Sequence, residues 1–107
     1  MYSIRDWLWV GKYTQTRDRA LLDSNGIQAM LQLADPYIQN GIESLYLQVT
    51  DGEPVSAEKF TRGLEFLRAQ RAAGRRTLIA CGAGISRSTI FAMAALMDAE
   101  QRDLFDA

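Results

Sequence analysis

The residues of this chain that are best suited to chemistry lie in one short run, Cys81 to Ser88, with the sequence Cys-Gly-Ala-Gly-Ile-Ser-Arg-Ser. Apolar residues precede the run from Thr77 to Ala80 and others follow it, which predicts a strand, a glycine-containing loop and a helix. The amides of such a loop and the N-terminus of the next helix bind a tetrahedral anion and favour the thiolate form of a nearby cysteine. Arg87 adds a two-pronged donor for phosphate oxygens. The run therefore predicts a site where a thiol accepts a phosphoryl group.

Each position of this run has a predicted role. The thiolate of Cys81 would attack phosphorus in line and form a phosphocysteine. The loop amides and the Arg87 guanidinium would hold the three equatorial oxygens. Ser88 would donate a hydrogen bond to the sulfur when it attacks and again when it leaves. The predicted phosphate-binding residues are Gly82, Ala83, Gly84, Ile85, Ser86 and Arg87.

The oxygen that leaves from phosphorus needs a proton, and the chain has no histidine to supply it. Asp51 is the predicted general acid, because it lies in an acidic loop directly after a predicted strand. The same carboxyl group would later activate water. Its neighbour Glu53 is the second choice. With one cysteine and no histidine, the sequence predicts no zinc site, and we expect no cofactor.

The rest of the sequence indicates the elements that must position these residues. Strands are expected at 7–10, 27–33, 44–49 and 77–80. Helices are expected at 17–24 with Thr16 as the cap, between a cap at Ser56 and Gly74, and at 88–101. This alternation predicts an α/β fold with a central, mainly parallel sheet of four to five strands flanked by helices. Ligands bind beyond the carboxyl ends of such strands, so the loops at 50–54 and 81–87 should lie side by side there.

Length and composition restrict the class of protein. We expect the 107 residues to form one domain, 1–107. Twelve basic and 13 acidic residues give a net charge of −1, which argues against a nucleic-acid-binding protein. Apolar stretches fall well short of the roughly 20 residues of a membrane span, and the N-terminus lacks the layout of a signal peptide. A single cysteine cannot form an internal disulfide, so we expect a cytoplasmic protein.

Cys81 to Ser88, followed by Thr89, resembles the signature loop of the cysteine-dependent dual-specificity protein phosphatases of the protein tyrosine phosphatase superfamily. That motif reads His-Cys-x5-Arg-Ser/Thr, often with Ala-Gly-Ile-Ser-Arg-Ser inside, and residues 83–88 match it. Val49-Thr50-Asp51 resembles the family strand that ends in the general-acid aspartate, and residues 7–11 and 26–31 resemble two earlier strands. The resemblance implies metal-free hydrolysis of phosphate monoesters on Ser, Thr or Tyr of a phosphorylated protein or peptide.

The chain departs from the family pattern in two places. Ala80 stands where the family has the histidine that organises the loop. Family members also continue with a further helix, so we interpret the C-terminal helix as missing or cut short, with 103–107 as the first turn of another helix. An apolar surface near Leu104 and Phe105 would then be open to self-association.

Two other functions stay open at this point. The chain could be a pseudophosphatase module that binds phosphorylated partners without turnover. A thiol redox enzyme of similar loop design, such as an arsenate reductase, ranks lower because the chain has no second cysteine to resolve the intermediate. Phosphoinositide-directed relatives of the family often carry lysines in the loop that corresponds to 82–86, and this chain has none there. The resemblance therefore implies a protein substrate rather than a phosphoinositide.

Overall fold

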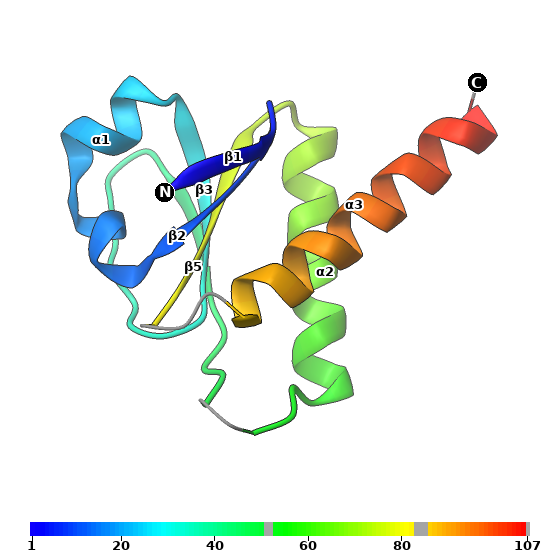
Figure 1. The fold of residues 1–107 in the computed structure, drawn as a ribbon. Helices are drawn as coiled ribbons and strands as arrows, with labels where there is room; N and C mark the ends of the chain where they lie inside the picture. The colour runs from blue at the N-terminus through cyan, green and yellow to red at the C-terminus, as the bar shows by residue number, and fades with distance from the viewer. Residues whose placement is uncertain (51–52, 83–85, 107) are drawn as a thin grey trace.

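The protein is described by a computed structural model that covers residues 1–50, 53–82 and 86–106. Its strands are β1 (Tyr2–Arg5), β2 (Leu8–Lys12), β3 (Ile27–Gln32), β4 (Glu43–Tyr46) and β5 (Arg76–Cys81). Its helices are the 3₁₀ helix η1 (Tyr13–Arg17) and the α-helices α1 (Arg19–Ser24), α2 (Ala57–Ala72) and α3 (Ser86–Asp106). The sheet lies between α1 on one face and the pair α2 and α3 on the other (Figure 1).

The sheet has the strand order β1-β2-β5-β3-β4, which puts β5 at its centre. β2, β5, β3 and β4 pair in parallel, and β1 runs antiparallel to β2. The predicted α/β fold with a mainly parallel, helix-flanked sheet of four to five strands is therefore confirmed. The sequence analysis missed β1, because Tyr2, Ser3 and Arg5 are exposed and the strand lacks the apolar alternation that marks the others.

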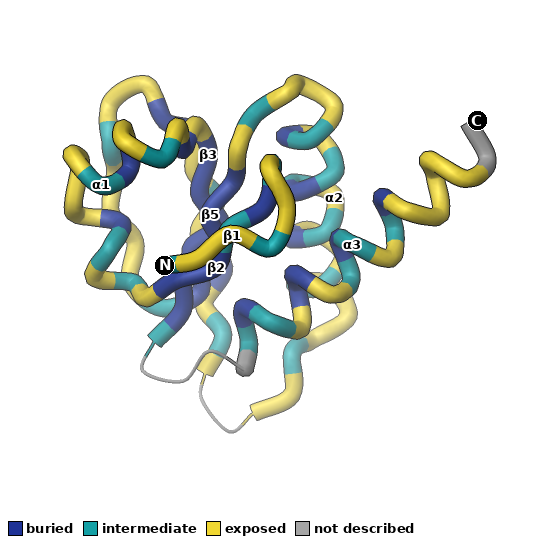
Figure 2. The backbone as a smooth tube through the Cα atoms, turned by 45° about the horizontal axis from the view of Figure 1, so that its top comes forward, coloured by how far each residue is buried: buried dark blue, intermediate teal, exposed yellow. Residues whose placement is uncertain are grey.

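The alternation of side chains along β5 builds two hydrophobic cores. Ile79 and Cys81 point to the face covered by α2 and α3, and Leu78 and Ala80 point to the face covered by α1. Buried residues accordingly concentrate in the central strands and on the inner sides of the helices (Figure 2). The larger core, beneath α2 and α3, contains Leu8, Val10, Leu31, Leu33, Leu47, Leu67, Ile79, Cys81, Phe91, Ala92 and Ala95.

α2 and α3 pack closely because one residue on α2 has no side chain. Gly63 is buried, and a Cβ atom there would clash with the ring of Phe91, which is itself fully buried. The ring of Phe60 lies beside that of Phe91, with 5.7 Å between centroids. Ser56 accepts a hydrogen bond from the Lys59 amide at 3.2 Å, so the predicted N-cap of α2 is confirmed.

One helix prediction was wrong, and another misplaced the start of a helix. The helix expected at 17–24 is α1, which begins at Arg19, because Asp18 rather than Thr16 caps it by accepting from the Leu21 amide at 3.1 Å. The expected new helix at 103–107 is instead the end of α3, which runs without a break to Asp106. Neither proline nor glycine interrupts it there, and the Asp103 carboxylate accepts from Arg71 on α2 at 2.8 Å.

Candidate active site

Cys81 is the last residue of the central strand β5, at the carboxyl edge of the parallel sheet. Its side chain is 2% exposed and lies in the core beneath α3. The Sγ atom lies 3.8 Å from the carbonyl oxygen of Gly82, which is the next residue of the loop. The predicted strand before the cysteine and the helix after the loop are both confirmed. Ala83, Gly84 and Ile85, three of the predicted phosphate-binding residues, lie outside the described residues.

α3 begins at Ser86 and places Arg87 and Ser88 in its first turn. The helix packs over β5 and β2, so its N-terminus, with its partial positive charge, lies at the same edge of the sheet as Cys81. Arg87 is half-buried. Ser88 is fully buried, and its hydroxyl donates a long hydrogen bond of 3.4 Å to the Ile79 carbonyl. That bond ties the helix start to β5, and the expected bond from Ser88 to the sulfur stays a prediction.

The loop that carries the predicted general acid leaves the sheet at this edge as well. Beyond β4, the amide of Leu47 donates to the Gln32 carbonyl at 2.9 Å, and that of Val49 donates to Leu33 at 3.1 Å. These bonds keep the segment alongside β3 up to Val49. Asp51 lies outside the described residues, and Glu53 is exposed. The segment that ends at Val49 and the strand that ends at Cys81 therefore leave the sheet at the same edge. That the two loops meet there stays a prediction.

Two further strand ends flank Cys81, and the sequence analysis did not single them out. Lys12, the last residue of β2, is in register with Cys81. On the β3 side, the Leu33 amide donates to the Ala80 carbonyl at 2.8 Å, and the methyl group of Ala34 lies 4.0 Å from where a Cβ of Gly82 would be. The order of strands could have revealed Lys12, because it follows a predicted strand whose carboxyl end must lie at the same edge.

Ala80, which replaces the family histidine, is fully buried on the opposite face of β5 from the thiol. It packs with Leu22, Met30 and Leu78 beneath α1, so its surroundings are apolar. This position offers a methyl group where the family motif has an imidazole that could donate a hydrogen bond.

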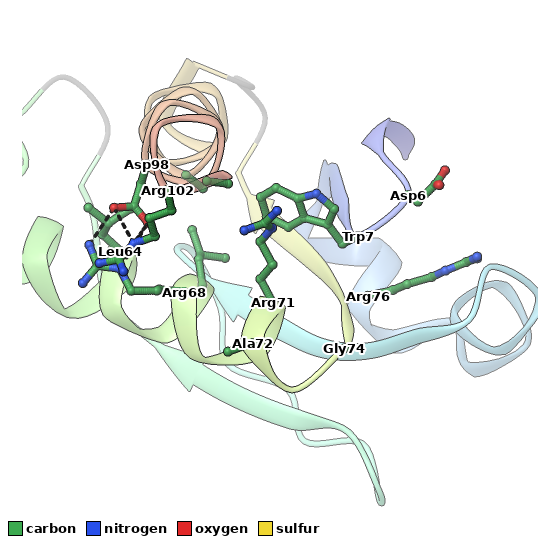
Figure 3. A pocket seen from close by; sticks show the side chains of 13 residues that line it. Asp6, Trp7, Leu64, Arg68, Arg71, Ala72, Gly74, Arg76, Asp98 and Arg102 are labelled. Carbon is green, nitrogen blue, oxygen red and sulfur yellow. Dashed lines mark hydrogen bonds and ion pairs between the residues drawn. The ribbon is translucent and has the colours of Figure 1, made fainter. Parts of the chain in front are cut away.

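A cavity of about 550 Å³ lies at the other end of β5, away from Cys81. Figure 3 shows it between α2 and α3, with Trp7, Arg68, Arg71 and Asp98 around it. Arg68 donates two hydrogen bonds to the Asp98 carboxylate, at 3.1 and 2.8 Å. These bonds hold the pKa of Asp98 below its ordinary value and raise the pKa of Arg68. The pair of Arg68 on α2 and Asp98 on α3 thus holds the two helices together beside this cavity.

The structure thus has a thiol at the carboxyl end of a central parallel strand, with a helix N-terminus and an arginine at the same edge of the sheet. Such an edge of an α/β sheet can bind an anion. The family model described as "Dual specificity phosphatase, catalytic domain" matches residues 8–107. The chain belongs to this family of protein phosphatases.

Solved structures share the fold. The crystal structure of DUSP15 matches with a TM-score of 0.80 and 27% identity, covering 91% of this chain and 64% of that chain. OH1 from the Orf virus, described as a tyrosine phosphatase, matches with a TM-score of 0.75 and 19% identity. The match covers 96% of this chain and 62% of the OH1 chain. The human tyrosine phosphatase-like serine/threonine/tyrosine-interacting protein matches with a TM-score of 0.77 and 24% identity. The match covers 97% of this chain and 78% of that chain.

The chain thus spans less than two thirds of the DUSP15 and OH1 chains. No curated protein matches its sequence. Among residues 1–50, 53–82 and 86–106, no helix is both long enough and apolar enough to cross a bilayer.

Proposed function

We propose that residues 1–107 form the catalytic domain of a cysteine-dependent protein phosphatase that acts on phosphotyrosine, phosphoserine or phosphothreonine. The observation that carries this proposal is the position of Cys81, at the end of the central strand and opposite the first turn of α3 with Arg87. This arrangement suits one tetrahedral dianion above one thiol. Membership of the family adds independent support.

In the proposed reaction, the Cys81 thiolate attacks phosphorus and the bond from phosphorus to the ester oxygen breaks. The amides of residues 82–87 and the guanidinium of Arg87 stabilise the charge on the equatorial oxygens. Asp51 gives its proton to the leaving oxygen, so the product is a neutral alcohol or phenol. Water then attacks the phosphocysteine, Asp51 takes a proton from it, and the S–P bond breaks to release inorganic phosphate. Ser88 assists the sulfur as nucleophile and as leaving group.

Hydrolysis of a small aryl phosphate in the presence of a chelator tests this proposal. We expect turnover by the wild type and none above background by Cys81→Ser, because serine at this site lacks an activating base. Met93→Ser is a suitable control, since this residue of α3 is 58% exposed and lies outside the proposed site. A wild type without Cys81-dependent turnover would refute the enzyme proposal.

The second candidate function is a pseudophosphatase module that captures phosphorylated partners without turnover. The buried Ala80 favours it, because the position of the family histidine is filled by a methyl group. Phosphopeptide binding measured by fluorescence anisotropy on an inactive wild type would support this alternative. Cys81-dependent turnover of the same peptides would exclude it.

We also propose that the protein acts in the cytoplasm and that copies of it can self-associate through α3. The single cysteine supports a reducing compartment. One side of α3 exposes Ile90, Met93, Met97 and Leu104, at spacings that place them along a single stripe. Sedimentation at increasing concentration should show an oligomer that Met97→Glu abolishes. A monomer at all concentrations would refute self-association.

A further inference from the structure

Lys12 is a cation beside the candidate active site that none of the roles above uses. It ends β2 and is the in-register partner of Cys81 on β5, so their backbones are about 5 Å apart, the ordinary spacing of adjacent strands. In parallel strands, residues in register share a face of the sheet. Val10 and Ile79, the register pair two residues earlier and so on the same face, both lie in the core beneath α2 and α3. The side chain of Lys12 therefore leaves the sheet on the same face as the thiol.

The backbone at Lys12 is held in place. Its amide donates to the Oε1 atom of Gln15 at 2.9 Å. The preceding residue, Gly11, is buried so tightly that a Cβ atom there would clash with Gln15 and Met1. The start of the lysine side chain is thus fixed at the mouth of the site, while its four-carbon stem is flexible.

The ammonium group of Lys12 is also free of acidic partners within the described part of the chain. The residue is exposed, and no carboxylate lies within ion-pair distance of it there. Several arginines, in contrast, pair with an aspartate or a glutamate: Arg5, Arg19, Arg68, Arg71 and Arg102. An unpaired cation next to an anion-binding loop is available to a negative charge on a ligand.

We propose that Lys12 binds a second anionic group on the phosphopeptide substrate, a carboxylate or a second phosphate within two residues of the phosphorylated residue. This inference deepens the proposed phosphatase function and rests on it. Arg87 and the loop amides suffice for one phosphate, so Lys12, one strand away, meets the next charge. In an extended peptide, side chains two residues apart point to the same side and lie about 7 Å apart. The Lys12 backbone lies about 5 Å from that of Cys81, and the lysine stem can span the remaining distance.

The test compares phosphotyrosine peptides that differ at the flanking positions: one series with aspartate, one with phosphothreonine and one with asparagine. The wild type should prefer the two anionic series by about fivefold in kcat/KM, the upper range for an exposed ion pair. Lys12→Met should reduce this preference to near one and leave turnover of a small aryl phosphate unchanged. Lys12→Arg should retain the preference, which would show that the charge matters.

Arg76→Gln is the matched control, because it removes one positive charge at the far end of β5. It should keep the wild-type preference. An equal preference for all peptides in the wild type, or a preference that survives Lys12→Met in a folded protein, would overturn the inference. So would an equal loss of aryl phosphate turnover, since Lys12 would then act on the reacting phosphate itself.

Failure of the Lys12 inference can be distinguished from failure of the phosphatase proposal. If the wild type turns over no substrate, the enzyme proposal fails, and anisotropy with the same peptides tests Lys12 by binding. The anionic peptides should then bind about fivefold more tightly than the asparagine series, with the difference lost in Lys12→Met. No binding of any peptide would overturn the inference about Lys12 as well.

Discussion

The two ends of β5 hold positive charge in different ways. At the amino end, arginines of α2 and α3 surround a cavity and bind the chain's own carboxylates: Arg68 and Arg102 bind Asp98, and Arg71 binds Asp103. At the carboxyl end, Lys12 has no carboxylate partner in the described part of the chain, and it stands beside Cys81.

This difference separates structural charges from charges that can serve a ligand. A cation that is already neutralised by a neighbouring acid gains little from a phosphate, because binding would first have to break the existing ion pair. A cation without such a pair can bind an incoming anion at no such cost. The arginines of α2 and α3 beside the cavity are therefore poorly placed to bind a ligand, and the edge that holds Cys81 is the better candidate for a functional site.

After the complete loss expected for Cys81→Ser, the largest effect that we predict is on the acid step at the carboxyl end. Asp51→Asn should lower kcat about 10²–10⁴-fold, because the leaving oxygen loses its proton donor. It should also remove the basic limb of the pH profile, since asparagine has no proton to lose. Steady-state kinetics across pH measure both. Glu53→Gln should leave the profile intact. If Glu53→Gln has the larger effect, the general acid is assigned to the wrong carboxylate.

The comparison of the two ends is tested directly by arginine variants. Arg87→Lys should lower kcat/KM about 10²–10³-fold, because an ammonium group cannot donate the paired bonds that a guanidinium group gives to phosphate. Arg71→Lys, at the amino end, should leave kcat/KM near the wild-type value. Equal losses in the two variants would contradict the functional separation of the two ends.

The packing of α3 against α2 and the sheet should contribute strongly to the free energy of unfolding. Phe91→Ala removes a fully buried ring from between α3, α2 and the sheet, and should destabilise the fold by about 3–5 kcal/mol. Chemical denaturation followed by circular dichroism measures the change. Met93→Ala, two residues along α3 and 58% exposed, should change stability by less than about 0.5 kcal/mol. A small effect of Phe91→Ala would show that α3 is not anchored through this ring.

The smallest effect concerns the ion pairs at the amino end. The pKa of Asp98 is lowered in the folded state by its bonds from Arg68, so folding favours the charged carboxylate. This contribution is present above the unfolded pKa of about 3.9 and is lost as the pH falls through the lower folded value. Because both side chains are partly exposed, Asp98→Asn should cost no more than about 1 kcal/mol at neutral pH.

Thermal melts at pH 7 and at acid pH measure this effect. The difference between wild type and Asp98→Asn should shrink at acid pH, and phosphatase activity at pH 7 should stay unchanged. Asp23→Asn, which breaks the exposed pair with Arg19 on α1, is a control with a smaller expected cost. A large loss of activity in Asp98→Asn would mean that the cavity end contributes to catalysis.

Much of the fold followed from local patterns. The strands at β2, β3, β4 and β5 and the cap at Ser56 were predicted, because apolar runs and capping residues act over a few positions. β1 was missed, since an exposed edge strand is defined by its partner rather than by its own residues. The start of α1 was misplaced because Thr16 and Asp18 are both good caps, and only the hydrogen bond to the Leu21 amide distinguishes them.

The sequence by itself determined the chemistry of the candidate site. Cys81, Arg87 and Ser88 are close along the chain, so a strand, a loop and a helix start suffice to bring them to one place. Only the tertiary structure decided which side chains stand beside them. Lys12 stands beside Cys81 because β2 pairs with β5 in a particular register, and Arg68 is neutralised because α2 packs on α3. Neighbours across a sheet are set by pairing and packing between distant segments, which spacing along one chain does not specify.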